Sequence, residues 1–218
     1  MPTLRFSGFL FSALAVMLGA TNVRAEAPKA DADGWMTLFD GKSMDGWKVV
    51  ENADTWKLVD GTLTCKGNRS HLFYVADDKP FVNFEFKADV KAAKGSNSGI
   101  YFHTKFQEAD WPKFGYECQV NNSMLSEPKK SGSLYGTVDV KEQLIADDTW
   151  WTQTITVQGK HIVVKLNDKV VVDYNEPDNQ PAFDAKFERR LGSGTFALQG
   201  HDPGSVVSFK NIHVRRLP

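Results

Sequence analysis

The sequence is poor in cysteine: its 218 residues include only Cys65 and Cys118, and no Cys-x-x-Cys pair occurs. Without such a pair, a thiol redox role has no support. Both cysteines share strand parity with apolar neighbours, so we expect both to face the core. This parity permits one disulfide between them and is equally compatible with two buried thiols that pack as small apolar residues.

An excess of positive charge is also missing, because 26 Lys and Arg residues are balanced by 27 Asp and Glu residues. Proteins that bind nucleic acid usually carry a basic patch, so we expect no nucleic-acid partner. Motifs of common hydrolytic sites are absent as well. The chain contains neither the Gly-x-Ser-x-Gly turn of serine hydrolases nor a His-Glu-x-x-His metal motif.

Long apolar runs are confined to the N-terminus. Residues 8–19 form an apolar run after Arg5, and Val23-Arg24-Ala25 has small residues at the −3 and −1 positions of a cleavage site. We therefore expect residues 1–25 to be a secretory signal peptide and residues 26–33 to be a flexible leader, with a retained N-terminal anchor as the alternative. The run is shorter than the ~20 residues that span a bilayer. We expect an exported product, periplasmic or secreted, with no membrane contact after signal cleavage.

From residue 34 onward, short segments of alternating apolar and polar residues are separated by turn residues. In residues 84–90, for example, Phe, Phe, Ala and Val alternate with Glu, Lys and Asp. Many short strands with turns at regular spacing predict an antiparallel sandwich or barrel, and the absence of an internal repeat disfavours a propeller. We therefore predict one all-β domain over residues 34–218.

The strand-like segment 115–121 has polar residues at every second position. Its alternation places a carboxylate and two amides on one face, opposite three side chains that can pack in a core. Three further segments alternate in the same way, so a shared sheet would display a basin of amides, aromatic rings, imidazoles and one acid. Such a basin suits a carbohydrate, since aromatic rings stack on sugar faces and amides pair with hydroxyls. The predicted members are Asn97, Tyr101, His103, Glu117, Gln119, Asn121, Tyr135, Gln199 and His201.

Alternatives to this interpretation stay open. Antiparallel sheets often expose one polar face, so the basin could be an ordinary solvated surface. His103, Glu117 and His201 could hold a divalent metal ion with two nitrogens and an oxygen, or the imidazoles could serve in hydrogen bonding and proton transfer. Conventional glycosidases use two carboxyl groups about 5 to 9 Å apart. The basin offers only Glu117, so the sequence argues against that chemistry.

Six motifs run in order along the chain: residues 34–47 (GWMTLFDGKSMDGW), 97–100 (NSGI), 115–120 (GYECQV), 132–136 (GSLYG), 198–201 (LQGH) and 209–212 (FKNI). Together they resemble the DUF1080 family of 3-keto-disaccharide hydrolases. The resemblance implies a concanavalin A-like jelly-roll sandwich of two antiparallel sheets, similar in fold to the family 16 glucanases. The chain lacks the E-x-D-x-x-E motif of those glucanases, and it has Cys118 where the family usually has an aliphatic residue.

The resemblance also implies a reaction that needs no second carboxylate. Family substrates are glycosides whose C3 hydroxyl has been oxidised to a ketone by a separate glycoside 3-dehydrogenase. The ketone acidifies the hydrogen on C2, so a base can remove it, the C1 leaving group departs, and water adds back. Our hypothesis for this reaction is that Glu117 or His201 is the base and that Tyr101 and Tyr135 position the sugar ring. Gln119, Asn97 and His103, or a metal that they help to hold, stabilise the enolate.

Two other functions compete with this enzyme. A non-catalytic, lectin-like carbohydrate-binding domain would use the same aromatic rings and amides, and fold alone does not separate the two. Such a domain has little need of two imidazoles that converge on a carboxylate. A structural envelope protein would bind no ligand at all.

Overall fold

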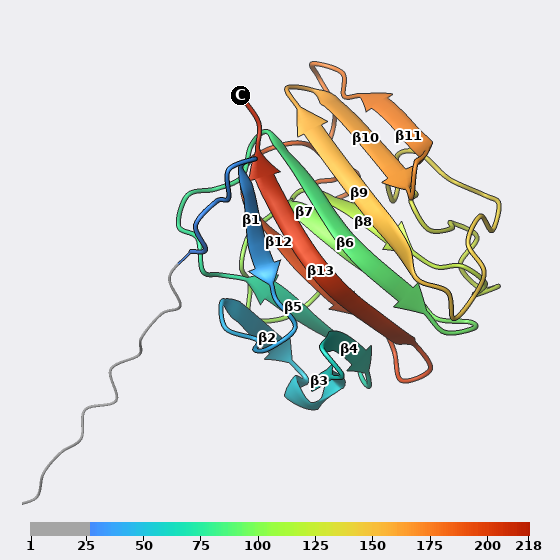
Figure 1. Ribbon diagram of the computed structural model, residues 1–218. Coiled ribbons are helices and arrows are strands. Elements are labelled where there is room, and N and C mark those ends of the chain that lie inside the picture. The colour runs from blue at the N-terminus through green and yellow to red at the C-terminus, as the bar shows by residue number, and fades with distance from the viewer. Residues whose placement is uncertain (1–26) are drawn as a thin grey trace, which may run out of the picture.

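The computed structural model describes residues 27–218, which form two antiparallel β-sheets packed face to face (Figure 1). The predicted signal peptide, residues 1–25, lies outside the described residues. Within the described part of the chain, no helix is long and apolar enough to cross a membrane. The prediction of an all-β domain with two antiparallel sheets is confirmed.

The larger sheet has eight strands and the smaller sheet has five. In spatial order the larger sheet contains β11 (Lys169–Asn175), β10 (His161–Leu166), β9 (Trp151–Gln158), β6 (Phe84–Ala92), β13 (Val206–Arg216), β4 (Thr62–Lys66) and β3 (Trp56–Val59), and β1 (Trp35–Phe39) also pairs with β13. The smaller sheet contains β2 (Trp47–Glu51), β5 (Ser70–Tyr74), β12 (Thr195–Gly200), β7 (Ser98–Thr104) and β8 (Tyr116–Val120). A short 3-10 helix, η1 (Ala53–Thr55), precedes β3.

The core lies between the two sheets and is rich in phenylalanine. Strand β6 alternates buried and half-buried residues along its whole length, as its sequence predicts, with its apolar residues facing inward. Phe196 of β12 reaches across from the smaller sheet, and its ring centroid lies 4.7 Å from that of Phe86 and 5.0 Å from that of Phe84. Aromatic contacts of this kind join the sheets and bury much of the apolar surface that stabilises the fold.

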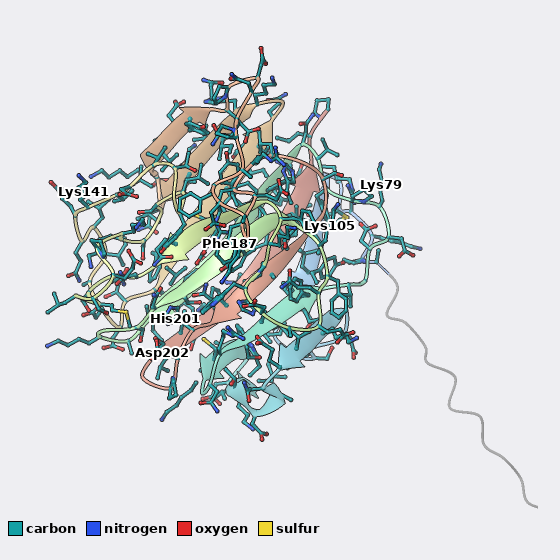
Figure 2. All side chains as sticks on the ribbon, turned by 180° about the vertical axis from the view of Figure 1, so that it is seen from behind. Lys79, Lys105, Lys141, Phe187, His201 and Asp202 are labelled. Atoms are coloured by element: carbon teal, nitrogen blue, oxygen red, sulfur yellow. The ribbon has the colours of Figure 1, made fainter. Side chains whose placement is uncertain are left out.

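The second face of the smaller sheet is covered by long connections rather than by another sheet. Strands β5, β7 and β8 are buried at every position, so neither of their faces is open to solvent. The covering segments are residues 105–115, 121–150 and 176–194, which follow β7, β8 and β11. Figure 2 views the molecule from this side and shows Phe187 and His201 in front of the smaller sheet. Polar residues on this face are therefore enclosed.

The two cysteines are free thiols, which resolves the alternatives left open by the sequence. Both face the core, as their parity predicts, and burial raises the pKa of each thiol to about 12. Cys65 Sγ donates to the carbonyl of Gln199 at 3.6 Å, and Cys118 Sγ accepts from Gln153 Nε2 at 3.0 Å. Thiols with such high pKa values are poor nucleophiles, so they act as packing residues.

Gly115 supports the start of β8 by a close backbone approach. Its φ is +70°, and a Cβ there would overlap the carbonyl oxygen of Phe102 and lie 2.7 Å from the carbonyl carbon of His103. Gly159, in the β9–β10 turn, has a similar φ of +59°, but a Cβ at that position would meet nothing within 4 Å. The pair therefore separates the cost of a left-handed backbone from the cost of a steric clash.

We expect Gly159→Ala to lower the free energy of unfolding by about 1 kcal/mol, because only the left-handed conformation is penalised. Gly115→Ala should lower it by about 3 kcal/mol or more, because the clash with backbone atoms adds to that penalty. Urea unfolding followed by circular dichroism measures both values. Equal losses in the two variants would contradict the close approach.

Candidate active site

Two adjacent rows of side chains cross the covered face of the smaller sheet. In one row Tyr101 of β7 lies opposite Glu117 of β8, and in the next row Gly99 lies opposite Gln119. Gln199 of β12 pairs with His71 of β5 in that second row. Because side chains alternate along a strand, these residues all project to the same face. The register thus brings together Tyr101, Glu117, Gln119 and Gln199, as the sequence predicts.

A cavity of about 180 Å³ lies over these rows. Its walls combine sheet residues with residues of all three covering segments. The lining residues are Asn97, Tyr101, Trp111, Glu117, Gln119, Glu127, Tyr135, Phe187, Arg189, Gln199 and His201.

The carboxylate of Glu117 lies at the floor of the cavity and is held by three donors. Its Oε2 accepts hydrogen bonds from the Tyr101 hydroxyl at 2.9 Å and from Arg189 Nη2 at 3.2 Å, and its Oε1 accepts from Gln199 Nε2 at 2.8 Å. The residue is 5% exposed. Burial raises the pKa of Glu117 above its ordinary value, although Arg189 and the hydrogen bonds oppose this shift. Glu117 is therefore a more basic carboxylate than a surface glutamate.

Gly99 provides the space in which this carboxylate lies. A Cβ at position 99 would come within 2.6 Å of Glu117 Oε1 and 2.9 Å of Glu117 Cγ. Any larger residue would displace the Glu117 side chain from its three donors. The glycine of the Asn97-Ser98-Gly99-Ile100 motif thus has a steric role at the site.

Arg189 was not predicted from the sequence, although it is the only cation that contacts Glu117 among the described residues. Its guanidinium lies between the aromatic rings of Phe187 at 5.0 Å, Tyr101 at 5.5 Å and Tyr135 at 5.7 Å. Its Nε and Nη1 atoms are buried and have no protein partner. Two nitrogens of this guanidinium beside the cavity therefore carry N–H groups that no protein acceptor satisfies. Arg189 belongs to the irregular segment 176–194, whose sequence has no periodicity that could have placed it.

His201 lies at the cavity beside Asp202, with which it forms an oriented pair. The His201 Nδ1 atom lies 2.6 Å from Asp202 Oδ2, which also accepts a hydrogen bond from the Ser205 hydroxyl at 2.9 Å. Burial alone would raise the pKa of Asp202, but these hydrogen bonds outweigh burial and lower it. An ionised Asp202 accepts from Nδ1–H, so the lone pair of His201 resides on Nε2. That nitrogen is suited to take up a proton.

Asn97, Gln119 and Gln199 supply amide groups to the cavity. Gln119 Nε2 donates to Asn97 Oδ1 at 2.9 Å, and this bond leaves Gln119 Oε1 buried without a protein partner. Gln199 Oε1 is likewise buried and without a partner. Unpartnered acceptors beside unpartnered arginine donors fit a ligand that carries both hydroxyl and carbonyl groups.

A second carboxylate borders the cavity, which corrects the expectation of a single acid. Glu127 comes from the segment that follows β8, and its Oε2 accepts from the Tyr135 hydroxyl at 3.3 Å. Its Oε1 lies 3.6 Å from Lys129 Nζ and accepts from the backbone N–H of Lys129. Glu127 lies in the long stretch between two predicted strands, where parity gives no information on direction.

Asn121, predicted to contact substrate, does not line the cavity. It is fully buried, and its Nδ2 donates to the carbonyls of Glu127 and Lys129, each at 2.8 Å. Its Oδ1 accepts from the backbone N–H of Met124 at 2.8 Å. The side chain therefore shapes the segment that presents Glu127 to the cavity.

The prediction that His103 joins the Glu117 basin is wrong in its geometry. His103 has a φ of +56°, which interrupts the alternation of β7 at its end. Its Nε2 donates to the carbonyl of Val82 at 2.8 Å, and its Nδ1 accepts from the Gly192 N–H at 3.2 Å. The ring packs 5.4 Å from that of Phe84. Burial lowers the pKa of His103 to about 4, so the imidazole is neutral near neutral pH.

The same placement decides whether the predicted metal ligands fit a metal ion. His103 is directed away from Glu117, and the Glu117 carboxylate already faces the positive charge of Arg189. Among the described residues, no group of three or more His, Cys, Asp or Glu residues is arranged to hold a metal ion. The set His103, Glu117 and His201 does not fit a divalent ion, and we derive no step through one.

The buried imidazole of His103 should make the fold sensitive to acid. The pKa is about 4 in the folded protein and about 6.5 in the unfolded chain, so between these values only the unfolded chain binds a proton. Stability then falls as pH drops through this window, by up to about 1.4 kcal/mol per pH unit. We expect His103→Gln to flatten the dependence of the free energy of unfolding on pH between 6.5 and 4. Denaturant unfolding at several pH values tests this, and parallel curves for the two proteins would contradict it.

A family model and a sequence relative both connect this chain to proteins named for 3-keto sugars. A family model described as a 3-keto-alpha-glucoside-1,2-lyase-like domain matches residues 34–215. A 3-keto-disaccharide hydrolase of Bacteroides thetaiotaomicron is 33% identical over 81 residues, a match that covers 33% of this chain and 28% of that protein. The chain therefore matches less than a third of the length of this relative.

Two solved structures show the similarity of fold. A candidate glycosyl hydrolase from Parabacteroides distasonis superposes with a TM-score of 0.71 at 22% identity, covering 86% of this chain and 95% of that one. The carbohydrate-binding module CBM66 from Bacillus subtilis superposes with a TM-score of 0.55 at 14% identity, covering 78% of this chain and 95% of that one. The prediction of a jelly-roll sandwich is confirmed.

Proposed function

The chain belongs to the family of 3-keto-alpha-glucoside-1,2-lyase-like domains, and from this premise we propose that its cavity cleaves the glycosidic bond of 3-keto-glycosides by elimination followed by hydration. The family supports a function of the glycoside hydrolase or lyase type, and the names of the family and of the Bacteroides relative point to a 3-keto substrate. The site itself supplies a separate electrostatic reason for this choice of substrate.

The observation that carries the proposal is the buried cation at the cavity. Ordinary glycoside hydrolysis passes through an oxocarbenium-like state, in which positive charge develops on the sugar and is stabilised by carboxylates. Arg189, whose Nε and Nη1 atoms have no protein partner, has the wrong sign for that state. Proton removal from C2 of a 3-keto sugar instead develops negative charge on the C3 oxygen, which a buried guanidinium stabilises.

The residues of the cavity can be assigned to the steps of this reaction. His201 Nε2 takes the C2 proton, while Asp202 holds Nδ1–H and stabilises the imidazolium that forms. The electron pair of the C–H bond forms the enolate, and Arg189 stabilises the negative charge on its C3 oxygen. The C1–O bond then breaks, and the protonated His201 passes the proton taken from C2 to the departing aglycone oxygen. Water then adds at C1 while His201 takes one of its protons and delivers that proton to C2, which gives the free 3-keto sugar.

The proposal extends to the biological setting of the reaction. A C3 ketone requires prior oxidation of the glycoside, so a glycoside 3-dehydrogenase would act upstream. The sequence of residues 1–25 supports export, to the periplasm or the medium.

A second candidate function is conventional hydrolysis of unoxidised glycosides. Glu127 favours it, because this residue brings a second carboxylate to the cavity. Its ion pair with Lys129 and its contact with Tyr135 occupy both of its oxygens, which weighs against a role as nucleophile or acid. Non-catalytic sugar binding is the third outcome to be tested.

Substrate selectivity separates these three functions. The mature protein is incubated with 4-nitrophenyl 3-keto-α-glucoside and with its unoxidised counterpart, and nitrophenol release is measured. We expect nitrophenol release from the keto glycoside to be at least about 10³ times faster than from the unoxidised one, because only the ketone acidifies C2. Release from the unoxidised glycoside would support the two-carboxylate reaction. Binding of both compounds without release would indicate a carbohydrate-binding domain.

Two substitutions test the assignment of residues. His201→Ala removes the proton acceptor, and Glu117→Gln removes the negative charge that pairs with Arg189. We expect each to lower kcat/KM on the keto glycoside by about 10² to 10⁴, with an unchanged circular dichroism spectrum. His161→Ala, on the outer strand β10, is the matched control and should keep full activity. Near-normal turnover in both site variants would refute the assignment.

A further inference from the structure

Trp111 forms one wall of the cavity and separates it from a polar cluster that lies partly at the surface. On the cavity side, its ring centroid lies 5.3 Å from that of His201. On the other side, it lies 5.3 Å from the ring of His71 at an interplanar angle of 78°. Trp111 belongs to residues 105–115, which form no strand and cannot be positioned by ladder hydrogen bonds. Its orientation must therefore depend on side-chain contacts.

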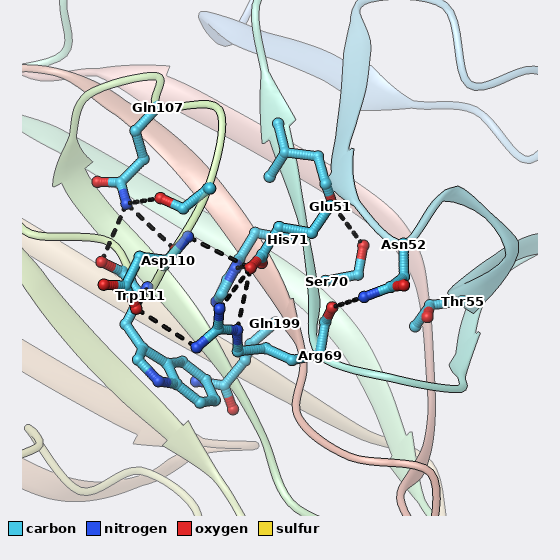
Figure 3. Close-up of polar contacts among 12 residues, drawn as sticks. Glu51, Asn52, Thr55, Arg69, Ser70, His71, Gln107, Asp110, Trp111 and Gln199 are labelled. Carbon is cyan, nitrogen blue, oxygen red and sulfur yellow. Dashed lines mark hydrogen bonds and ion pairs between the residues drawn. The ribbon is translucent and has the colours of Figure 1, made fainter.

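Three charged residues provide these contacts, and we name Glu51, Arg69 and Asp110 the clasp (Figure 3). Arg69 donates from Nε at 3.0 Å and from Nη2 at 2.6 Å to Glu51 Oε1, and from Nη1 at 3.3 Å to Asp110 Oδ1. Asp110 Oδ1 in turn accepts the backbone N–H of Trp111 at 2.8 Å. The clasp links the end of strand β2, the residue that precedes strand β5 and the segment that carries Trp111.

The guanidinium of Arg69 also covers the indole ring directly. Its central carbon lies 5.2 Å from the Trp111 ring, within the range of a cation–π contact. Arg69 thus contacts Trp111 in two ways, through Asp110 and through the ring. A lysine could not reproduce both, because a compact ammonium lacks the planar fork that reaches two carboxylates at once.

Two of the three clasp residues have a backbone conformation that is rare for residues other than glycine, which indicates that the clasp is a specific arrangement. Glu51 has a φ of +67° and Asp110 a φ of +70°, a region that residues other than glycine rarely adopt. Glu51 is also the most enclosed member, with a side chain 11% exposed, and its Oε2 lies 3.3 Å from His71 Nδ1. Burial lowers the pKa of His71 to about 4, so a neutral imidazole donates to Glu51 and packs behind Trp111.

Gln107 braces the same segment from within. Its Nε2 donates to the carbonyls of Ala109, Asp110 and Trp111 at 2.7 to 3.1 Å, and its Oε1 accepts from the N–H of Lys113. The internal brace gives the segment its shape, whereas the clasp fixes that shape to the sheet.

We propose that Glu51, Arg69 and Asp110 are positioning residues that hold Trp111 as the platform for the sugar ring and as the support for His201. The catalytic part of this proposal rests on the proposed function, and the structural part does not. None of the three clasp residues lines the cavity, so their effect on turnover must pass through Trp111. Small displacements of a positioning wall are costly to catalysis because the reacting groups must be held in near-attack geometry.

The structural part is tested by amide hydrogen exchange, which needs no substrate. We expect Arg69→Ala to accelerate exchange of the Trp111 amide by about tenfold or more. This amide donates to Asp110, and the Asp110 carboxylate loses its hydrogen bond from Arg69 in the variant. Glu85→Gln is the matched control, because it breaks a comparable Arg215–Glu85 ion pair on strands β6 and β13. Unchanged exchange at Trp111 in Arg69→Ala overturns the proposal, whatever the enzyme does.

The catalytic part is tested by a double-mutant cycle on kcat/KM for 4-nitrophenyl 3-keto-α-glucoside. We expect about a tenfold loss in Arg69→Ala and about a thirtyfold loss in Trp111→Ala. The double variant should also lose about thirtyfold, because the clasp has nothing left to position. A loss near about three-hundredfold, the product of the single effects, would show an independent role for Arg69 and overturn the proposal. Absence of turnover in the wild-type protein contradicts the proposed function instead, and leaves the exchange result to decide on the clasp.

Discussion

The buried pair of Glu117 and Arg189 is the constraint on which the rest of the site depends. Taking two charges out of water is costly, and their attraction offsets this cost only when the remaining hydrogen-bonding capacity is satisfied. Glu117 meets that condition through Tyr101 and Gln199, while the Nε and Nη1 atoms of Arg189 are left without a protein acceptor. The pair is therefore complete on the carboxylate side and incomplete on the guanidinium side. A ligand with an anionic or carbonyl oxygen would complete it.

This arrangement explains why the smaller sheet is covered. An open sheet face would leave the pair in water, where the same interaction is weak and screened. The three long connections bury the pair and bring in Trp111, Glu127 and Arg189, which no strand could supply from the plane of the sheet. The larger sheet plays a different part, because its inner face fills the core and its outer face carries ordinary charged residues such as those of β6. Stability and chemistry are thus assigned to different faces of one sandwich.

The sequence predicted the site residues that lie on strands, whereas the site residues that it missed lie in the connections. Tyr101, Glu117, Gln119 and Gln199 lie on regular strands, where period-2 alternation fixes the face of every side chain and antiparallel pairing brings the faces together. Alternation failed at His103, because a single left-handed residue at the end of β7 redirects the side chain. The residues that were missed lie in connections with no periodicity, where direction is set by tertiary contacts alone. Loop length could indicate where cavity walls would lie, but not which side chains would form them.

A similar fold occurs in the carbohydrate-binding module CBM66, so the jelly roll itself does not explain catalysis. A binding site needs stacking surfaces and hydrogen bonds, which the aromatic rings and amides of the cavity already provide. It gains nothing from a buried guanidinium, nor from an imidazole whose tautomer is fixed by Asp202, since both features carry desolvation or ordering costs. Such costs are reasonable where charge develops during a reaction, because a preorganised site need not reorganise at that moment. The positions of Arg189 and His201 therefore favour an enzyme over a lectin more strongly than any property of the sheet on which they lie.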